Sequence, residues 1–280
     1  MQIIETVPVM QSFARKQRES KITIGLVATM GYLHEGHLSL VDVIRESVDI
    51  VILSIYINPS QFGPNEDFRY YPRDRQRDIE LCQKRKVDVI FCPKNEDVYS
   101  EDHSVYIREE NLSHTLCGIF RPKFLSGVCT IVAKLFNIVQ PHTAVFGMKD
   151  FQQVAVIKKM VRDLNFPVEI ILGTTVREKD GLAMSSRNAY LSKGERNDAI
   201  GIYKALCYAK KLISEETLNV YFLRREIVRL ISERNHLRVI YVSILHRDTL
   251  RPLSEVILGE TLIGVAVWCG NVRLVDNILI

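Results

Sequence analysis

The sequence lacks the features of a secreted or membrane-spanning protein. None of its six cysteines forms a Cys-x-x-Cys pair, and their spacing follows no disulfide framework. No window contains 18 uninterrupted apolar residues, so we expect no membrane span. Residues 1–6 have neither a basic flank nor a long apolar core, so we expect no signal peptide. These absences favour a cytoplasmic protein with reduced thiols.

A dense basic surface is also missing. The chain carries 37 basic and 33 acidic residues, a net charge of +4. This small excess does not favour nucleic acid as a partner. A basic stretch at 69–77 lies among Asp67, Asp74 and Asp78, and we interpret it as a solvated face.

What the chain does have is apolar content, at 47% of 280 residues, enough for one large or two ordinary domains. Apolar runs alternate with segments of helical period over the first 172 residues. Strands are predicted at 22–29, 49–57, 87–92, 143–146 and 167–172, with an extra short strand at 104–108. Helices are predicted at 37–47, 75–86 (after an N-cap at Asp74), 126–139 and 151–164.

This alternation predicts right-handed βαβ units, and therefore an α/β fold with a Rossmann-like, doubly wound parallel sheet. The pattern changes near residue 174. Helices are then predicted at 193–213 and 218–233, and strands at 239–245 and 261–268. We expect two domains, residues 1–175 with the parallel sheet and residues 176–280 as a smaller α+β domain.

Loops rich in polar and charged side chains follow four of the predicted strands. Ligands of doubly wound sheets bind outside the carboxyl ends of the strands, so we expect these loops to meet at a single site. In chain order, the loops contribute His34 and His37; Asn58, Gln61 and Phe62; Gly147, Lys149, Asp150 and Gln153; and residues 184–188.

Each cluster also has a simpler interpretation. His34 and His37 could be zinc ligands, but no third ligand stands at a suitable spacing, or they could be ordinary surface histidines. We favour phosphate contacts, with Gly36 allowing close approach to the backbone. Asp150 and Gln153 could form only a helix capping box. Lys149 would weaken that helix start unless an anion offset its charge, which favours a functional role for Lys149.

The remaining two clusters differ in chemistry. Residues 184–187 carry two hydroxyls and a guanidinium at the domain boundary, which suits a mobile phosphate clamp as well as a plain surface loop. Asn58 and Gln61 are neutral amides beside Pro59 and Phe62. They suit a small, hydroxylated and partly apolar substrate.

Residues 34–37 resemble the HxGH signature of the HIGH nucleotidyltransferase superfamily, and residues 184–187 resemble its second, KMSKS-like loop. Together with 29–37, 58–63, 146–153 and 181–188, they resemble the pantothenate synthetase (pantoate–β-alanine ligase) family over essentially the whole chain. Residues 273–277 resemble the same family. The four motifs in this order are specific to it, whereas the HxGH element belongs to the superfamily.

The resemblance implies a ligase that joins pantoate to β-alanine through a pantoyl adenylate, with ATP as a substrate, Mg²⁺ held mainly by the ATP phosphates, and a homodimeric assembly. It implies catalytic roles for His34, His37, Lys149 and Arg187. The implied ATP contacts are Met30, His34, His37, Gly147, Lys149, Asp150, Val176, Met184, Ser185, Ser186 and Arg187. The implied pantoate and β-alanine contacts are Met30, Asn58, Gln61 and Gln153.

The chain departs from the family pattern beside the pantoate pocket. Phe124 and Ser126 stand where the family usually has histidine and arginine, and lesser changes are Ala28 and Tyr32. Two other functions remain open at this stage. A nucleotidyltransferase of the same superfamily would use a phosphorylated acceptor, and would need more cations near Gln61. A nucleotide- or RNA-binding module would bind more weakly as salt rises and would not turn over.

Overall fold

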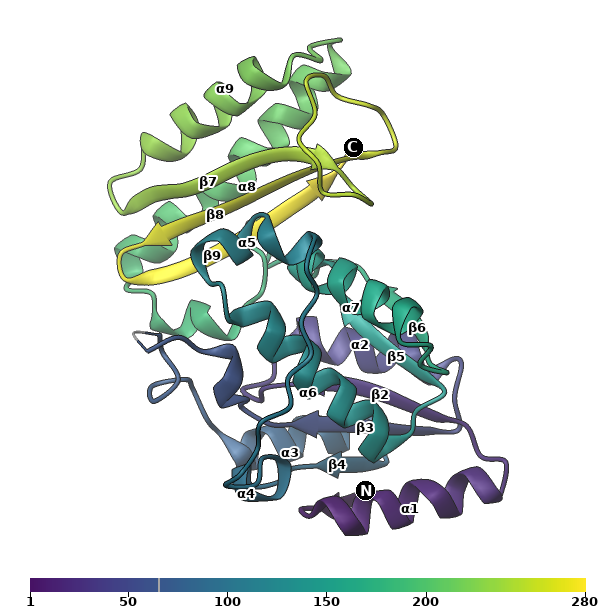
Figure 1. The fold of residues 1–280 in the computed structure, drawn as a ribbon. Coiled ribbons are helices and arrows are strands. Elements are labelled where there is room, and N and C mark those ends of the chain that lie inside the picture. The colour runs from purple at the N-terminus through teal and green to yellow at the C-terminus, as the bar shows by residue number, and fades with distance from the viewer. Residues whose placement is uncertain (65) are drawn as a thin grey trace.

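Two β-sheets organise the chain in the computed structural model, which describes residues 1–64 and 66–280 (Figure 1). Residue 65, inside the predicted loop 58–73, lies outside the described residues. A parallel sheet has the strand order β1-β4-β3-β2-β5-β6, and an antiparallel sheet has the order β7-β8-β9. The first sheet contains β1 (Gln2–Ile4), β2 (Ile24–Thr29), β3 (Ile50–Ile55), β4 (Val89–Phe91), β5 (Thr143–Gly147) and β6 (Glu169–Gly173). The second contains β7 (Leu237–His246), β8 (Thr261–Cys269) and β9 (Val272–Leu279).

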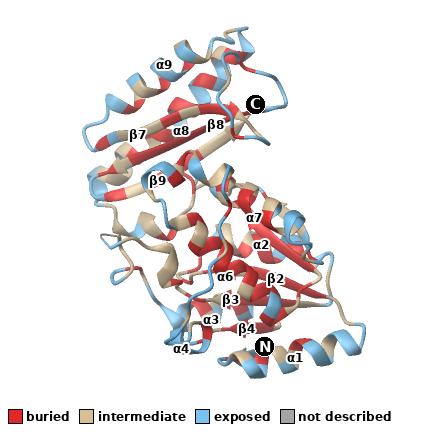
Figure 2. Ribbon diagram, in the orientation of Figure 1, coloured by how far each residue is buried: buried red, intermediate tan, exposed pale blue. Residues whose placement is uncertain are grey.

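Helices cover both faces of the parallel sheet. The helices in this part of the chain are α1 (Val7–Glu19), α2 (Glu35–Arg45), α3 (Arg75–Lys84), α4 (Asn95–Val98), α5 (Cys117–Phe120), α6 (Phe124–Val139) and α7 (Phe151–Asp163). Successive strand residues point to opposite faces. Leu26 accordingly packs in a core with α1, α6 and α7 residues, whereas Val27 packs in a second core with residues of α2 and α3. Figure 2 shows this sheet buried on both sides.

The direction of winding reverses at β2, and this fixes where a ligand can bind. β2 pairs with β3 on one side and with β5 on the other, all parallel. The chain proceeds outward through β3 and β4, then crosses over to β5 and β6. A crevice therefore opens between the carboxyl ends of β2 and β5. His34 follows the first of these strands, and Lys149 follows the second.

The predicted α/β fold is confirmed, but one predicted strand is wrong and several short or terminal elements were missed. No strand forms at 104–108, because the backbone there is bonded to side chains of α6. Ile107 N donates to Thr130 Oγ1 at 3.0 Å, and Ser126 Oγ donates to Ile107 O at 3.0 Å. The elements β1, α1, α4, α5 and β9 were not predicted. Asp74 caps α3 as expected, since its side chain accepts from Arg77 N at 3.1 Å.

The antiparallel sheet packs between the last two helices and the elements at the carboxyl end of the first sheet. The helices α8 (Lys193–Ser214) and α9 (Val220–Ser232) contribute to a core with one face of β7–β9. Leu245 and Leu262 of the sheet cluster instead with Leu116 and with residues of α7. Asn277 Nδ2 donates to the carbonyl oxygens of Met148 and Lys149, at 3.0 and 2.9 Å. These contacts dock β9 against the loop that follows β5. None of the described helices has both the length and the apolar character of a bilayer span.

Candidate active site

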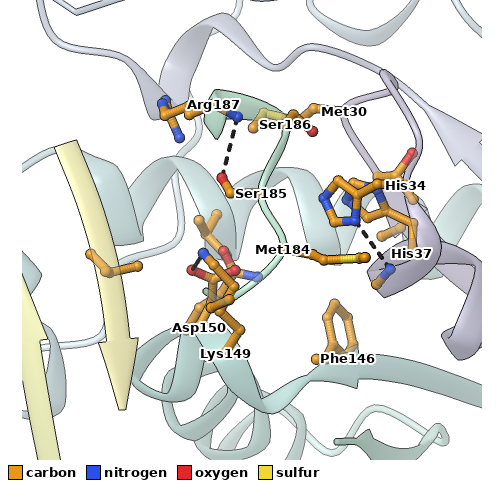
Figure 3. Close-up of a pocket in the computed structure, with 18 of the residues that line it drawn as sticks. Met30, His34, His37, Phe146, Lys149, Asp150, Met184, Ser185, Ser186 and Arg187 are labelled. Carbon is orange, nitrogen blue, oxygen red and sulfur yellow. Dashed lines mark hydrogen bonds and ion pairs between the residues drawn. The ribbon is translucent and has the colours of Figure 1, made fainter. Parts of the chain in front are cut away.

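One cavity of about 250 Å³ occupies the crevice beyond β2 and β5, beneath the C-terminal region. Every site residue predicted from the sequence lines it except Asn58. Figure 3 shows His34, His37 and Met184 together, with Lys149 and Asp150 across the same space and Ser185 and Ser186 beside it. The four loops that follow different strands therefore meet, as the sheet topology requires. Their roles in binding stay predictions.

The two histidines stand at the start of α2 in a fixed arrangement. His34 is the N-cap, and its Nδ1 accepts from Gly36 N at 3.1 Å. The two imidazole rings stack with centroids 4.0 Å apart. A Cβ atom on Gly36 would lie 2.9 Å from atoms of the His34 ring, so glycine is needed here for the ring to fold over the backbone.

Both imidazoles are held neutral. Burial, with Lys149 nearby, lowers the pKa of His34 to about 4. Burial, with His34 and Lys149 nearby, also holds the pKa of His37 well below its usual value. A neutral His34 that accepts at Nδ1 carries its proton on Nε2. His37 Nδ1 is buried without a hydrogen-bond partner among the described residues. Such an atom is expected to bond to a ligand or water.

A buried carboxylate shapes the loop that precedes the histidines. Asp78 is 2% exposed, and its two oxygens accept from Tyr32 N at 2.8 Å and Leu33 N at 2.7 Å. Gly31 and Tyr32 have φ angles of 80° and 49°, a tight turn that these bonds stabilise. The interpretation of 69–77 and its acidic neighbours as a solvated face was therefore wrong for Asp78. Burial raises the pKa of this carboxyl.

Lys149 and Asp150 lie at the start of α7. Lys149 Nζ is 3.7 Å from Asp150 Oδ1. Asp150 is the N-cap of α7, but its side chain makes no capping hydrogen bond. The capping-box interpretation of Asp150 and Gln153 is therefore wrong, and Asp150 and Gln153 line the cavity instead. The helix start remains open to an anion.

The segment that carries Ser185, Ser186 and Arg187 opens the short helix η4 (Ser186–Tyr190). Ser186 Oγ donates to Tyr32 O at 3.2 Å, which joins this segment to the histidine loop. Arg187 is bidentate with Asp67, at 2.9 and 2.8 Å. In Figure 3 its side chain points away from the histidines. Any phosphate contact by Arg187 has to compete with Asp67.

Asn58 lies behind the cavity wall and positions Gln61. It is 0% exposed. Its Nδ2 donates to Gln61 Oε1 at 2.9 Å and to Gly127 O at 3.1 Å, while Tyr99 OH donates to its Oδ1 at 3.0 Å. The Gln61 amide is thereby oriented, with its NH₂ group left for a ligand. A Cβ atom on Gly127 would lie 2.3 Å from Ser60 O, so glycine permits this approach of α6 to η1 (Pro59–Gln61).

The residues that depart from the family pattern have separate surroundings. Phe124 lines the cavity, with the Arg121 guanidinium 3.9 Å from its ring centroid. Arg121 also donates to Glu66 Oε1 at 2.7 Å and to Gln61 O at 3.1 Å. Ser126 bonds to Ile107 O and does not line the cavity. The change at 124 therefore alters the cavity wall, and the change at 126 does not.

The protein has a doubly wound parallel sheet, and a polar cavity lies at the switch point of that sheet. Residues of β9, from the second sheet, close the cavity. These features define a ligand-binding α/β protein. The family model described as pantoate–β-alanine ligase matches residues 2–279. Pantothenate synthetase of Thermotoga petrophila is 49% identical over 280 residues, which is 100% of both chains. That of Moorella thermoacetica is 48% identical over 100% of this chain and 99% of its own length.

Solved structures agree. Pantothenate synthetase of Thermus thermophilus superposes with a TM-score of 0.94 at 40% identity, covering 99% of each chain. Pantoate–β-alanine ligase of Francisella tularensis, complexed with β-γ ATP and β-alanine, superposes with a TM-score of 0.82 at 32% identity, covering 100% of this chain and 97% of its own. The chain belongs to the pantoate–β-alanine ligase family.

Proposed function

We propose that this protein condenses pantoate with β-alanine to give pantothenate, with ATP converted to AMP and pyrophosphate. The observation that carries the proposal is the meeting of the four family motifs around one cavity at the switch point of the sheet. Family membership over residues 2–279 supports it. The related Francisella protein, complexed with β-γ ATP and β-alanine, supports ATP and β-alanine as substrates.

In the first step a pantoate carboxylate oxygen attacks the α-phosphorus of ATP. The bond from that phosphorus to the bridging oxygen breaks, and pyrophosphate leaves. A carboxylate is ionised at neutral pH, so this step needs no general base. It needs in-line positioning and neutralisation of phosphate charge. In this proposal Lys149 and the neutral His34 and His37 supply these donors from the end of the sheet.

The other wall of the cavity supplies further donors. Ser185 and Ser186 offer hydroxyls, and Arg187 offers a guanidinium once it exchanges Asp67 for phosphate. The remaining ATP contacts in this proposal are Met30, Gly147, Asp150, Val176 and Met184, all of which line the cavity. Pantoate lies against Met30, with Gln61 and Gln153 holding its hydroxyl and carboxylate oxygens. Asn58 contributes by fixing Gln61.

In the second step the β-alanine amine attacks the acyl carbon of the adenylate. The bond from that carbon to the phosphate oxygen breaks, AMP leaves, and an amide forms. The ammonium must first lose a proton, and we assign solvent as the acceptor. His34, with a pKa lowered to about 4, is neutral at pH 7, but its free nitrogen carries a proton and donates rather than accepts.

The side chains that line the cavity are compatible with a Mg²⁺ ion that is held mainly by the phosphates of ATP. The described residues contain no group of three or more His, Cys, Asp or Glu side chains that could hold a metal. Hard oxygen ligands are what Mg²⁺ prefers, and triphosphate supplies them. When bound, the ion would neutralise phosphate charge, and Lys149 and the histidines would still orient the nucleotide.

Residues 1–175 and 176–280 are proposed as two domains, the second acting as a lid that carries residues 184–187. A homodimer is proposed because large apolar side chains of the first domain are exposed beside α6. Val105 and Tyr106 are 73% and 57% exposed, and Ile119 and Phe120 are 65% and 50% exposed. A cytoplasmic location is proposed because ATP is a substrate and all six cysteines are free thiols.

Exchange of labelled pyrophosphate into ATP tests the proposed function. We expect exchange that depends on pantoate and needs no β-alanine. Exchange that ignores pantoate would rule out the ligase. Exchange supported only by a phosphorylated acceptor would favour a nucleotidyltransferase, and salt-sensitive nucleotide binding without any exchange would favour a binding module.

A further inference from the structure

Four cationic side chains line the cavity, and one of them has no carboxylate partner among the described residues. Arg121 is paired with Glu66, Arg187 with Asp67, and Lys149 with Asp150. Arg273 forms no ion pair within 4.0 Å in the described part of the chain. An unpaired guanidinium in a partly buried cavity is costly unless a ligand anion binds to it.

The position of Arg273 is set by β9. Residues 272 and 274 of this strand belong to the core under α8 and α9, so residues 273, 275 and 277 face the opposite way. Asn277 docks that face by its bonds to Met148 O and Lys149 O. Arg273 is thereby placed over the cavity, next to α5, which lies beside β9 in Figure 1.

The Arg273 guanidinium has N–H donors that are free to bind a ligand. Arg273 Nη2 donates to Cys117 Sγ at 3.3 Å, which is a weak acceptor. Arg273 Nε is buried with no hydrogen-bond partner among the described residues. Tyr241 OH also lies 3.3 Å from Cys117 Sγ, so a phenol and a guanidinium converge on one thiol. A second, smaller hollow opens at this point and shares Cys117, Phe124 and Gln153 with the main cavity.

We propose that Arg273 binds the carboxylate of β-alanine, with Tyr241 as a second donor. The proposal rests on the proposed function. In the proposed function, Lys149, the histidines and residues 185–187 already bind the phosphates of ATP. The carboxylate of pantoate attacks the α-phosphorus. The carboxylate of the amino acid is the one anion left without a cation. Arg is suited to it because its edge presents two parallel N–H donors.

The proposal predicts how the amine substrate is selected. The amine must reach the acyl carbon beside Gln61 and Gln153 while the carboxylate stays on Arg273. Two methylene groups separate these ends in β-alanine. Glycine is too short to keep both contacts, and 4-aminobutyrate has to fold. An amine without a carboxylate, such as propylamine, gains nothing from Arg273.

Arg273→Gln tests the proposal, with Arg224→Gln as the matched control on the exposed side of α9. We expect Arg273→Gln to raise the KM for β-alanine about 10- to 100-fold, the loss typical of a charge-assisted pair. Pantoate-dependent pyrophosphate exchange should stay within about 2-fold. Propylamine, which has no carboxylate for Arg273 to bind, should react at the same rate with both variants and with the unchanged protein. Arg273→Lys should restore part of the β-alanine affinity.

The results separate this inference from the proposed function. If pantoate-dependent exchange is absent in the unchanged protein, the proposed function fails. If exchange is present but Arg273→Gln leaves the KM for β-alanine unchanged, the inference is wrong. An equal loss with propylamine would also overturn it, because it would mark a merely structural role. Tyr241→Phe keeps the ring on Phe120, and should raise the same KM about 2- to 10-fold. An unchanged KM for β-alanine in Tyr241→Phe would remove Tyr241 from the site. If Arg273→Gln does not fold, the test rests on Tyr241→Phe, and an unchanged KM in that variant would overturn the whole proposal.

Discussion

The two walls of the cavity are held in different ways. The histidine wall, residues 29–37, continues a buried strand into α2, and Asp78 holds two of its backbone N–H groups from within the core. The serine–arginine wall, residues 184–188, is joined to the first sheet by side-chain bonds from Ser186 to Tyr32 and from Arg187 to Asp67.

The difference shows which wall is preorganised. Charge stabilisation is most effective when the donors do not have to rearrange during the reaction, and the histidine wall meets this condition. The serine–arginine wall has polar contacts that phosphate oxygens can replace one for one. A ligand can therefore exchange these contacts at little cost, which is what a closing segment requires.

The largest expected effect comes from removing the cation that faces the histidine wall across the cavity. Lys149→Ala should slow pantoate-dependent pyrophosphate exchange about 10²–10³-fold, the usual loss for one charge-stabilising donor. The measurement is the exchange rate at saturating pantoate. Lys158→Ala, at an exposed position of α7, is the control and should leave the rate unchanged. An unaltered rate in Lys149→Ala would remove Lys149 from the mechanism.

Removing the carboxylate that supports the histidine wall should lower both the free energy of unfolding and the rate of pyrophosphate exchange. Asp78→Ala leaves the N–H groups of Tyr32 and Leu33 without acceptors, and should lower the free energy of unfolding by about 2–3 kcal/mol. Urea unfolding measures this. Asp74→Ala removes only the α3 cap and should cost about 1 kcal/mol without changing exchange. Equal exchange rates in the two variants would show that Asp78 does not shape the site.

Acid should weaken the same wall in the ligand-free protein. The pKa of His34 falls from 6.5 to about 4 on folding, so the unfolded chain binds more protons and stability falls as pH drops below 6.5. This single group should cost about 2 kcal/mol between pH 7 and pH 5. Unfolding of His34→Asn should show a shallower pH dependence over that interval. An identical pH dependence would contradict the burial of a neutral ring.

The smallest effect should come from loosening the other wall. Asp67→Asn weakens a partly exposed ion pair, so the free energy of unfolding should change by less than about 1 kcal/mol. Arg187 is then freer to meet phosphate, and ATP should bind about 3-fold more tightly by calorimetry. Glu66→Gln, which loosens Arg121 instead, should leave ATP affinity unchanged. Weaker ATP binding in Asp67→Asn would show that Asp67 orients Arg187 for the nucleotide.

Much of the fold follows from local sequence, because buried parallel strands are continuous apolar runs. The loops after β2, β3 and β5 could be brought together by one topological rule, which is why Lys149 and His34 were predicted to meet. β9 was missed because polar residues that face the cavity and the first sheet, such as Arg273 and Asn277, interrupt its apolar pattern. Asp78 was hidden among exposed charges, and only the packing of α3 shows it to be buried. The ion pair between Arg187 and Asp67 joins two distant parts of the chain, so only the folded structure shows it.

Transfer of ¹⁸O from pantoate tests the central claim most directly. With both carboxylate oxygens of pantoate labelled, attack at the α-phosphorus places one ¹⁸O in the phosphate of AMP and leaves one in the amide carbonyl of the product. Mass spectrometry of a single-turnover reaction should therefore show singly labelled AMP and unlabelled pyrophosphate. Unlabelled AMP, or label in inorganic phosphate formed with ADP, would contradict an adenylate intermediate.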